Sequence, residues 1–228
     1  MRGTGRVFLR GLLVWSTGVA VCLPLVLGKP VPFDLVFVLD VSPNMAEPSA
    51  FIREGARLAA HELTPDDRIA LLSYSSSITR HLEFADSRGQ FANAVWRATS
   101  RSIRKSAPRL LHDSIHAAIQ MFPTTPNVHR RRAIAVVTND ADQGSSHEPT
   151  ALIQDANRRS VAIWVFLVKD PQSVKPIGSR HNPYPDIANV VKEIHQLANE
   201  TGGEVVLKEP NGYVLRQIIE DCRAKWSR

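Results

Sequence analysis

The sequence predicts an α/β domain with a doubly wound, mainly parallel central sheet, one antiparallel edge strand and helices on both faces. Two observations predict this class. Short apolar runs rich in β-branched residues, typical of strands buried on both faces, recur along the chain. Between them lie longer stretches that repeat apolar residues at helical spacing. With 228 residues, of which 43% are hydrophobic and 22% charged, the chain is long enough for one domain with a full core.

Six strands are expected, and the first is the most apolar. It covers residues 33–39 (FDLVFVL), and the second, 68–74 (RIALLSY), follows the turn residues Pro65-Asp66-Asp67. Polar and apolar residues alternate in the third, at 77–84, as is typical of an edge strand. Further short apolar runs predict strands at 133–138, 161–168 and 204–207.

Helices are expected between these strands, where apolar residues return at every third or fourth position. Pro123 ends one of them, and Gly202-Gly203 end another. Trp96 and Trp164 fall at helix and strand positions that fit the core. The expected helices are residues 49–63, 91–103, 110–122, 150–159, 187–200 and 212–226, and a proline-rich loop is expected at 171–185.

The first residues differ in kind from the rest of the chain. Arg2, Arg6 and Arg10 precede an apolar run at 12–27, and no acidic residue occurs before Asp34. Basic residues ahead of a short apolar segment are typical of a secretory signal. The run is slightly short for a helix that spans a bilayer.

We therefore interpret residues 1–28 as a signal peptide or an N-terminal membrane anchor, and both alternatives remain open. Membrane association would occur through residues 11–28, and the folded domain is expected at 33–226. In both cases the domain is exported: it is periplasmic, secreted or membrane-anchored.

The net charge limits which kinds of partner are expected, and the cysteine content limits which disulfides can form. The net charge is +6, and it falls to +3 without the three N-terminal arginines, which does not favour a nucleic-acid partner. The basic cluster at 129–132 (HRRR) precedes a strand, so we interpret it as a solvated strand entrance rather than a polyanion patch. If Cys22 is removed with a signal peptide, Cys222 has no intrachain partner for a disulfide.

The topology predicts where a ligand binds. In a doubly wound sheet, ligands bind beyond the carboxyl ends of the strands, where the strand order reverses. The two most apolar strands lead into residues 40–44 (DVSPN) and 138–142 (TNDAD). These two segments are therefore the candidate site.

A buried strand that leads into Asp40-Val41-Ser42-Pro43-Asn44 and then into a helix resembles the von Willebrand factor type A (VWA) domain of adhesion proteins and many bacterial envelope proteins. The resemblance is closest to the bacterial VWFA-related group, covers 33–226, and implies a Rossmann-like VWA fold. Four further segments resemble the family in the same order, at 67–75 (DRIALLSYS), 110–115 (LLHDSI), 132–142 (RAIAVVTNDAD) and 197–203 (LANETGG).

The resemblance implies a metal-ion-dependent adhesion site, in which oxygen ligands hold Mg²⁺ and an acidic group of the partner completes the shell. Asp40 and Ser42 keep the first two ligand types. Asn44 stands in place of the second serine, Arg109 falls on the threonine, and Asn139 falls on the second aspartate.

These replacements indicate a degenerate site. A guanidinium has no acceptor atom and cannot ligate a cation, so Arg109 is the decisive departure. We expect no bound metal and no other cofactor. If Mg²⁺ binds, the ligands would be Asp40, Ser42, Asn44 and Asp140, the last after a shift of one residue. Two alternatives stay open for Arg109: it forms paired hydrogen bonds with Asp40 in the place of the metal, or it points into solvent.

No catalytic residues are assigned, and we expect no enzyme. His112 and His116 share one face of a helix, but no third metal ligand is evident. Ser146-His147 lies near Asp142, yet adjacent serine and histidine side chains diverge. Neither a nucleophile elbow nor a phosphate-binding glycine loop is present in the sequence.

The sequence thus predicts a non-enzymatic module that binds another protein on the exported side of a bacterial membrane. An alternative is a structural or assembly component of the cell envelope whose loop site is vestigial. A Mg²⁺-dependent adhesion module and a hydrolase are the remaining alternatives. The candidate ligand-binding residues are Asp40, Ser42, Asn44, Arg109, Asn139 and Asp140.

Overall fold

The central sheet has the strand order β3-β2-β1-β4-β5-β6 in a computed structural model that describes residues 31–84, 88–100, 109–139, 142, 144–168, 187–209 and 211–226. β3 is antiparallel to β2, and all other neighbours are parallel, as predicted. The strands are β1 (Phe33–Asp40), β2 (Arg68–Tyr74), β3 (Ile78–Leu82), β4 (Arg131–Thr138), β5 (Ala162–Val168) and β6 (Val205–Lys208).

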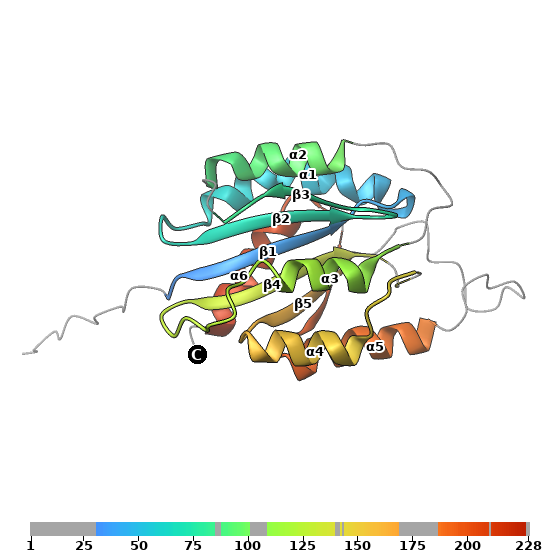
Figure 1. The fold of residues 1–228 in the computed structure, drawn as a ribbon. Coiled ribbons are helices and arrows are strands. Elements are labelled where there is room, and N and C mark those ends of the chain that lie inside the picture. Colours follow the sequence, from blue (N-terminus) through green and yellow to red (C-terminus); the bar gives the residue numbers. More distant parts are fainter. Residues whose placement is uncertain are drawn as a thin grey trace, which may run out of the picture.

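Helices cover both faces of this sheet. α3 and α4 pass in front of it in Figure 1, and α6 passes behind it. The helices are α1 (Ala46–His61), α2 (Phe91–Thr99), α3 (Leu111–Ile119), α4 (Pro149–Arg158), α5 (Ile187–Glu200) and α6 (Val214–Trp226), with short 3-10 turns η1 (Pro43–Met45) and η2 (Arg88–Gln90). The expected doubly wound α/β class is therefore confirmed.

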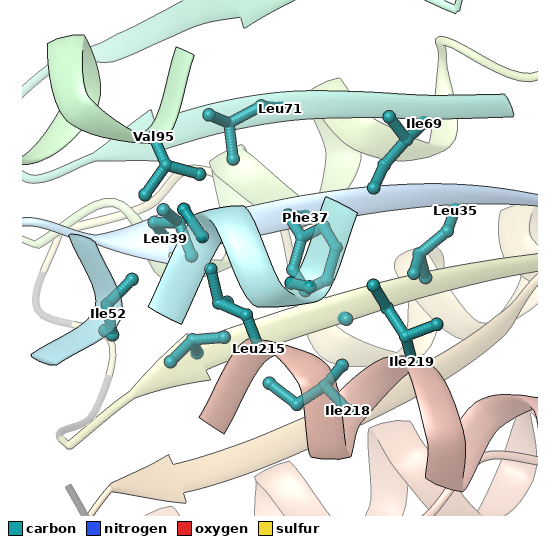
Figure 2. Packing of buried hydrophobic residues seen from close by; sticks show 14 of the residues in the cluster. Leu35, Phe37, Leu39, Ile52, Ile69, Leu71, Val95, Leu215, Ile218 and Ile219 are labelled. Atoms are coloured by element: carbon teal, nitrogen blue, oxygen red, sulfur yellow. The ribbon is translucent and has the colours of Figure 1, made fainter. Parts of the chain in front are cut away.

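The core has two halves because side chains of a strand point alternately to opposite faces. On β1, Leu35, Phe37 and Leu39 pack in the half that α1, α2 and α6 cover, as Figure 2 shows. Val36 and Val38 pack in the other half, against residues of α3, α4 and α5. β1 is completely buried over its length, which explains its nearly continuous apolar sequence.

The helix and strand ends differ from the prediction at several places. β4 begins at Arg131, two residues earlier than expected, because the Arg131 N–H donates to the carbonyl of Pro32 and extends the sheet. Trp164 is buried as expected, but Trp96 is 57% exposed on the outer face of α2, so its assignment to the core was wrong.

The basic cluster before β4 is also not the solvated strand entrance that the sequence suggested. Arg132 is only 5% exposed, and its guanidinium donates to the backbone carbonyls of Pro123, Thr125 and Arg159. Arg130 donates to the Asp34 carboxylate at the start of β1. Arg130 and Arg132 therefore hold the starts of β1 and β4 in place.

Residues 1–28, the loop at 171–185 and residues 101–103 of the expected second helix lie outside the described part of the chain. Within the described ranges, no helix combines the length and the apolar character needed to span a membrane. Cys222 on α6 is buried with a free thiol. Burial raises the pKa of this thiol, so the thiol stays protonated at neutral pH.

Candidate functional site

The strand order reverses between β1 and β4, and the candidate residues lie where these two strands end. Asp40 is the last residue of β1, and Asn139 directly follows β4. β2 is tied to the same end, because the Val41 N–H donates to the carbonyl of Tyr74. The structure thus brings together the two segments that the topology predicts as the site.

The Asp40 carboxylate is the centre of this region. It is 1% exposed, and its Oδ1 atom accepts the backbone N–H of Ser42 at 2.8 Å. Its Oδ2 atom accepts the hydroxyl of Thr138 at 2.8 Å, and Thr138 in turn accepts the hydroxyl of Tyr74 at 3.1 Å. A short chain of hydrogen bonds therefore runs from β2 through β4 to β1.

The burial of this carboxylate affects the protonation of its neighbourhood. Burial raises the pKa of Asp40, and the hydrogen bonds from Ser42 and Thr138 and the charge of Arg109 oppose this rise only in part. Burial, together with the nearby charge of Asp40, raises the pKa of Tyr74 well above its ordinary value. Tyr74 therefore stays a neutral donor to Thr138.

Ser42 and Asn44 begin the loop after β1. Ser42 is 2% exposed, and its hydroxyl does not cap the short helix η1 that it precedes. Asn44 is exposed on η1, and its backbone carbonyl accepts the side-chain N–H of Asn139 at 2.8 Å. This hydrogen bond joins the loops after β1 and β4 across the strand-order reversal.

Arg109 lies just before α3, beside the same region. The following residue, Leu110, donates its N–H to the carbonyl of Ser75 after β2. The Arg109 charge acts on both Asp40 and Tyr74, which places it near the buried carboxylate. Among the described residues, Ser42 and Thr138 donate hydrogen bonds to Asp40, and the paired hydrogen bonds of Arg109 with Asp40 stay a prediction.

Asp140 lies outside the described residues, and Asp142 is turned away toward α3. The Oδ1 atom of Asp142 accepts the backbone N–H of His112, and Ser145 Oγ accepts that of Asp113 at 3.0 Å. Leu110, the N-cap residue of α3, supplies no side-chain cap, and this distant loop accepts the N–H groups of His112 and Asp113 instead. Among the described residues, no group of three or more His, Cys, Asp or Glu side chains is placed to hold a metal ion.

Asp113, in the first turn of α3, also binds the loop that contains Asp142 and Ser145. Its Oδ1 atom accepts the backbone N–H groups of Ser146 and His147, at 2.9 and 3.1 Å, and lies 2.7 Å from His147 Nδ1. Asp113, Thr138 and Tyr74 were not among the predicted site residues. The sequence signal for them is that they lie in the segments 110–115, 132–142 and 67–75, which resemble the VWA family.

The geometry does not fit the hydrolase alternative. Asp113, and not Asp142, contacts His147. The Ser146 hydroxyl lies 3.5 Å from the same Nδ1 atom and 3.2 Å from Asp113, so it does not face the ring nitrogen that would act as the base. The three side chains together hold the loop and are not arranged for nucleophilic attack.

His116 on α3 stacks on His147, with ring centroids 3.9 Å apart and an interplanar angle of 16°. Burial and the charges of His147 and Arg159 lower the pKa of His116 from its ordinary value of 6.5, against the opposing charges of Asp155 and Asp113. A lowered histidine pKa means that the unfolded chain binds the proton more tightly than the folded domain. The contribution of His116 to stability is therefore present above pH 6.5 and is lost as the pH falls below it.

We expect the free energy of unfolding to decrease from pH 7 to pH 5 less steeply in His116→Phe than in the unaltered chain, because phenylalanine keeps the stacked ring and cannot become charged. Urea unfolding at several pH values measures this. His129→Phe, at an exposed histidine, is the matched control and should keep the original slope. Equal slopes for His116→Phe and the unaltered chain would contradict the assignment.

The sequence of residues 34–221 matches the family model of the von Willebrand factor type A domain. Solved structures with the same fold include the conserved hypothetical protein BatB from Bacteroides thetaiotaomicron, with a TM-score of 0.61 and 15% identity over 86% of this chain and 98% of that one. An aerotolerance-related membrane protein from Bacteroides fragilis NCTC 9343 has a TM-score of 0.57 and 15% identity over 85% of this chain and 99% of that one.

A mussel protein shares the fold as well. Proximal thread matrix protein 1 of the mussel byssus, with a zinc-occupied MIDAS motif, has a TM-score of 0.61 and 15% identity over 86% of this chain and 46% of that one. No protein with a curated function matches the sequence. At such low identity these likenesses show the fold alone.

Proposed function

Since the chain belongs to the von Willebrand factor type A domain family, we propose that it is a non-enzymatic module that binds another protein on the exported side of a bacterial membrane. The binding surface is centred on Asp40, Ser42, Asn44, Arg109 and Asn139. We also assign Asp140, which lies outside the described residues, to this surface on the basis of the sequence.

The observation that carries this proposal is the burial of Asp40 at the carboxyl end of the central strand. A buried carboxylate with a raised pKa costs folding free energy, and an apolar side chain would avoid that cost. Groups with such perturbed pKa values gather at functional sites. Asp40 also lies at the strand-order reversal, where ligands of this fold class bind.

The residues at this site do not fit Mg²⁺. The cation prefers several hard oxygen ligands, carboxylates among them. The described residues offer one carboxylate, Asp40, both of whose oxygens already accept hydrogen bonds, and the Arg109 charge acts on it. The Asn139 side chain donates to the backbone carbonyl of Asn44, and neither asparagine adds a negative charge. We therefore propose that binding is independent of metal.

Two further observations support export and protein binding. The apolar run at 12–27 behind three arginines is typical of an export segment. The description of one protein with a similar fold as a membrane protein is in line with a membrane location, and membership of the VWA family supports a role in binding proteins.

The test is co-purification from envelope membranes in mild detergent, comparing the unaltered chain with Asp40→Asn and Arg109→Ala. Because both changes alter the charge at the centre of the surface, we expect each to weaken capture of the partner about tenfold, or about 1.4 kcal/mol. Arg158→Ala is the matched control, since this arginine is 74% exposed on α4 and lies outside the proposed surface. Thermal unfolding verifies that each variant is folded.

Partner capture should be the same with and without a chelator. Loss of capture in the chelator would support the Mg²⁺-dependent adhesion alternative instead. Folded Asp40→Asn and Arg109→Ala variants that capture the partner normally would support the assembly component with a vestigial site.

A further inference from the structure

A second candidate site lies at the other end of the sheet. A cavity of about 510 Å³ opens at the amino ends of β4 and β5, between the loop before β4, the end of α4 and Thr201 after α5. The described residues that line it include three consecutive arginines, Arg130 to Arg132, and no acidic residue. Its volume lies in the usual range of ligand pockets, about 300–1,000 Å³.

Arg132 is the buried one of these three arginines, with 5% of the residue exposed. Its hydrogen-bond acceptors are three backbone carbonyls, at 2.7 to 2.9 Å, and none of them is a carboxylate. Its Nε atom is buried and has no acceptor among the described residues. Burial lowers the pKa of Arg132, as do the charges of Arg68 and Arg159, whereas Asp34 raises it. A buried cation that is solvated only by carbonyl dipoles favours a nearby anion.

The other lining residues add charge and an apolar rim. Arg131 is exposed at the start of β4, whereas Arg130 forms an ion pair with Asp34. Val128 is 87% exposed, and together with Pro126 it offers an apolar surface beside the arginines. Guanidinium groups bind phosphate through paired charge-assisted hydrogen bonds.

We propose that this cavity binds a phosphate group, either free or carried by a phospholipid headgroup. The second of these ligands, a phospholipid headgroup, depends on the proposal that the N-terminal segment is an export segment. The Arg131 N–H donates to the carbonyl of Pro32, so the cavity lies beside the point where the chain enters β1. Only a few residues separate Pro32 from the apolar run, and they span at most about 3.5 Å each. If residues 11–28 are in a membrane, the cavity lies close to its surface.

The test is ligand binding to the full chain in a nonionic detergent, measured by the rise of Tm with ligand concentration. The probes are inorganic phosphate, short-chain phosphatidylglycerol and short-chain diacylglycerol, each against chloride at the same ionic strength. We expect the two phosphate-bearing probes to stabilise the protein and diacylglycerol to have no effect. Tighter binding of phosphatidylglycerol than of inorganic phosphate identifies the lipid headgroup, and equal or weaker binding identifies free phosphate.

Two variants localise the effect. Arg131→Gln removes one guanidinium, and Val128→Asp places a carboxylate at the exposed rim, so each should weaken phosphate binding about tenfold, or about 1.4 kcal/mol. Arg158→Gln is the matched control, because this arginine is outside the cavity lining. Both altered positions are exposed, and Tm without ligand verifies folding.

The proposal is overturned if no phosphate-bearing probe binds, if diacylglycerol binds as well as phosphatidylglycerol, or if both variants bind phosphate normally. A chain that is not exported would still bind inorganic phosphate. Failure of the export proposal therefore removes only the lipid source and is distinguishable from failure of the site.

Discussion

Asp34→Ala is expected to destabilise the domain by about 1–3 kcal/mol, because it removes the buried acceptor of two charge-assisted hydrogen bonds whose arginine donors are partly exposed. Asp34 is 0% exposed at the start of β1. Its Oδ1 atom accepts Nε–H groups of both Arg68 and Arg130 at 2.8 Å, so its loss leaves two arginines without their carboxylate. Urea unfolding at neutral pH measures the change.

The matched control is Glu83→Ala. Glu83 forms a pair with Arg80 in which both side chains are more than half exposed, and such a surface pair contributes at most about 1 kcal/mol. Burial alone raises the pKa of Asp34, but the hydrogen bonds and charges of both arginines outweigh it and lower the pKa below 3.8. The stabilisation is therefore present above pH 3.8 and is lost in stronger acid. Equal stability losses for the two variants would contradict this account.

Gly203→Ala is expected to destabilise the domain by about 3 kcal/mol or more, at the upper end of the cost of overpacking. A Cβ atom at this position would lie 1.8 Å from the carbonyl oxygen of Ile163 and 2.5 Å from its carbonyl carbon. These are backbone atoms of β5, so the strand itself must move. Thermal or urea unfolding measures the loss.

The preceding glycine is the natural control. Gly202 has a φ of 78°, and a Cβ atom added there would meet nothing within 4 Å. Gly202→Ala therefore introduces only the strain of a left-handed residue, about 1 kcal/mol. If Gly202→Ala is the more destabilising of the two, the close approach of Gly203 to β5 is not the dominant constraint.

The fold was predictable because its signals are local. Continuous burial of β1 leaves an apolar sequence, and the glycines after α5 mark its end. Trp96 shows the limit of such reasoning. It falls at a helical position compatible with the core, but only the packing of α2 on the sheet decides which face of that helix is buried.

The candidate site was only partly predictable. Asp40 and Asn139 could be placed together because the ends of neighbouring parallel strands meet. The contacts of Asp113 and Asp142 could not be predicted, because they join a helix to a loop that is distant in the sequence. The burial of Arg132 could not be predicted either, because it depends on three backbone carbonyls from two separate segments, the loop before β4 and the end of α4.

The central position of β1 has a consequence for the order in which the chain folds. Asp40 at the end of β1 and Thr138 at the end of β4 are hydrogen-bonded although 98 positions separate them. β1 is therefore synthesised long before its second neighbour exists, and long-range pairing of this kind is slow. Until β4 arrives, the most apolar strand has one open edge, which is the kind of surface that promotes aggregation.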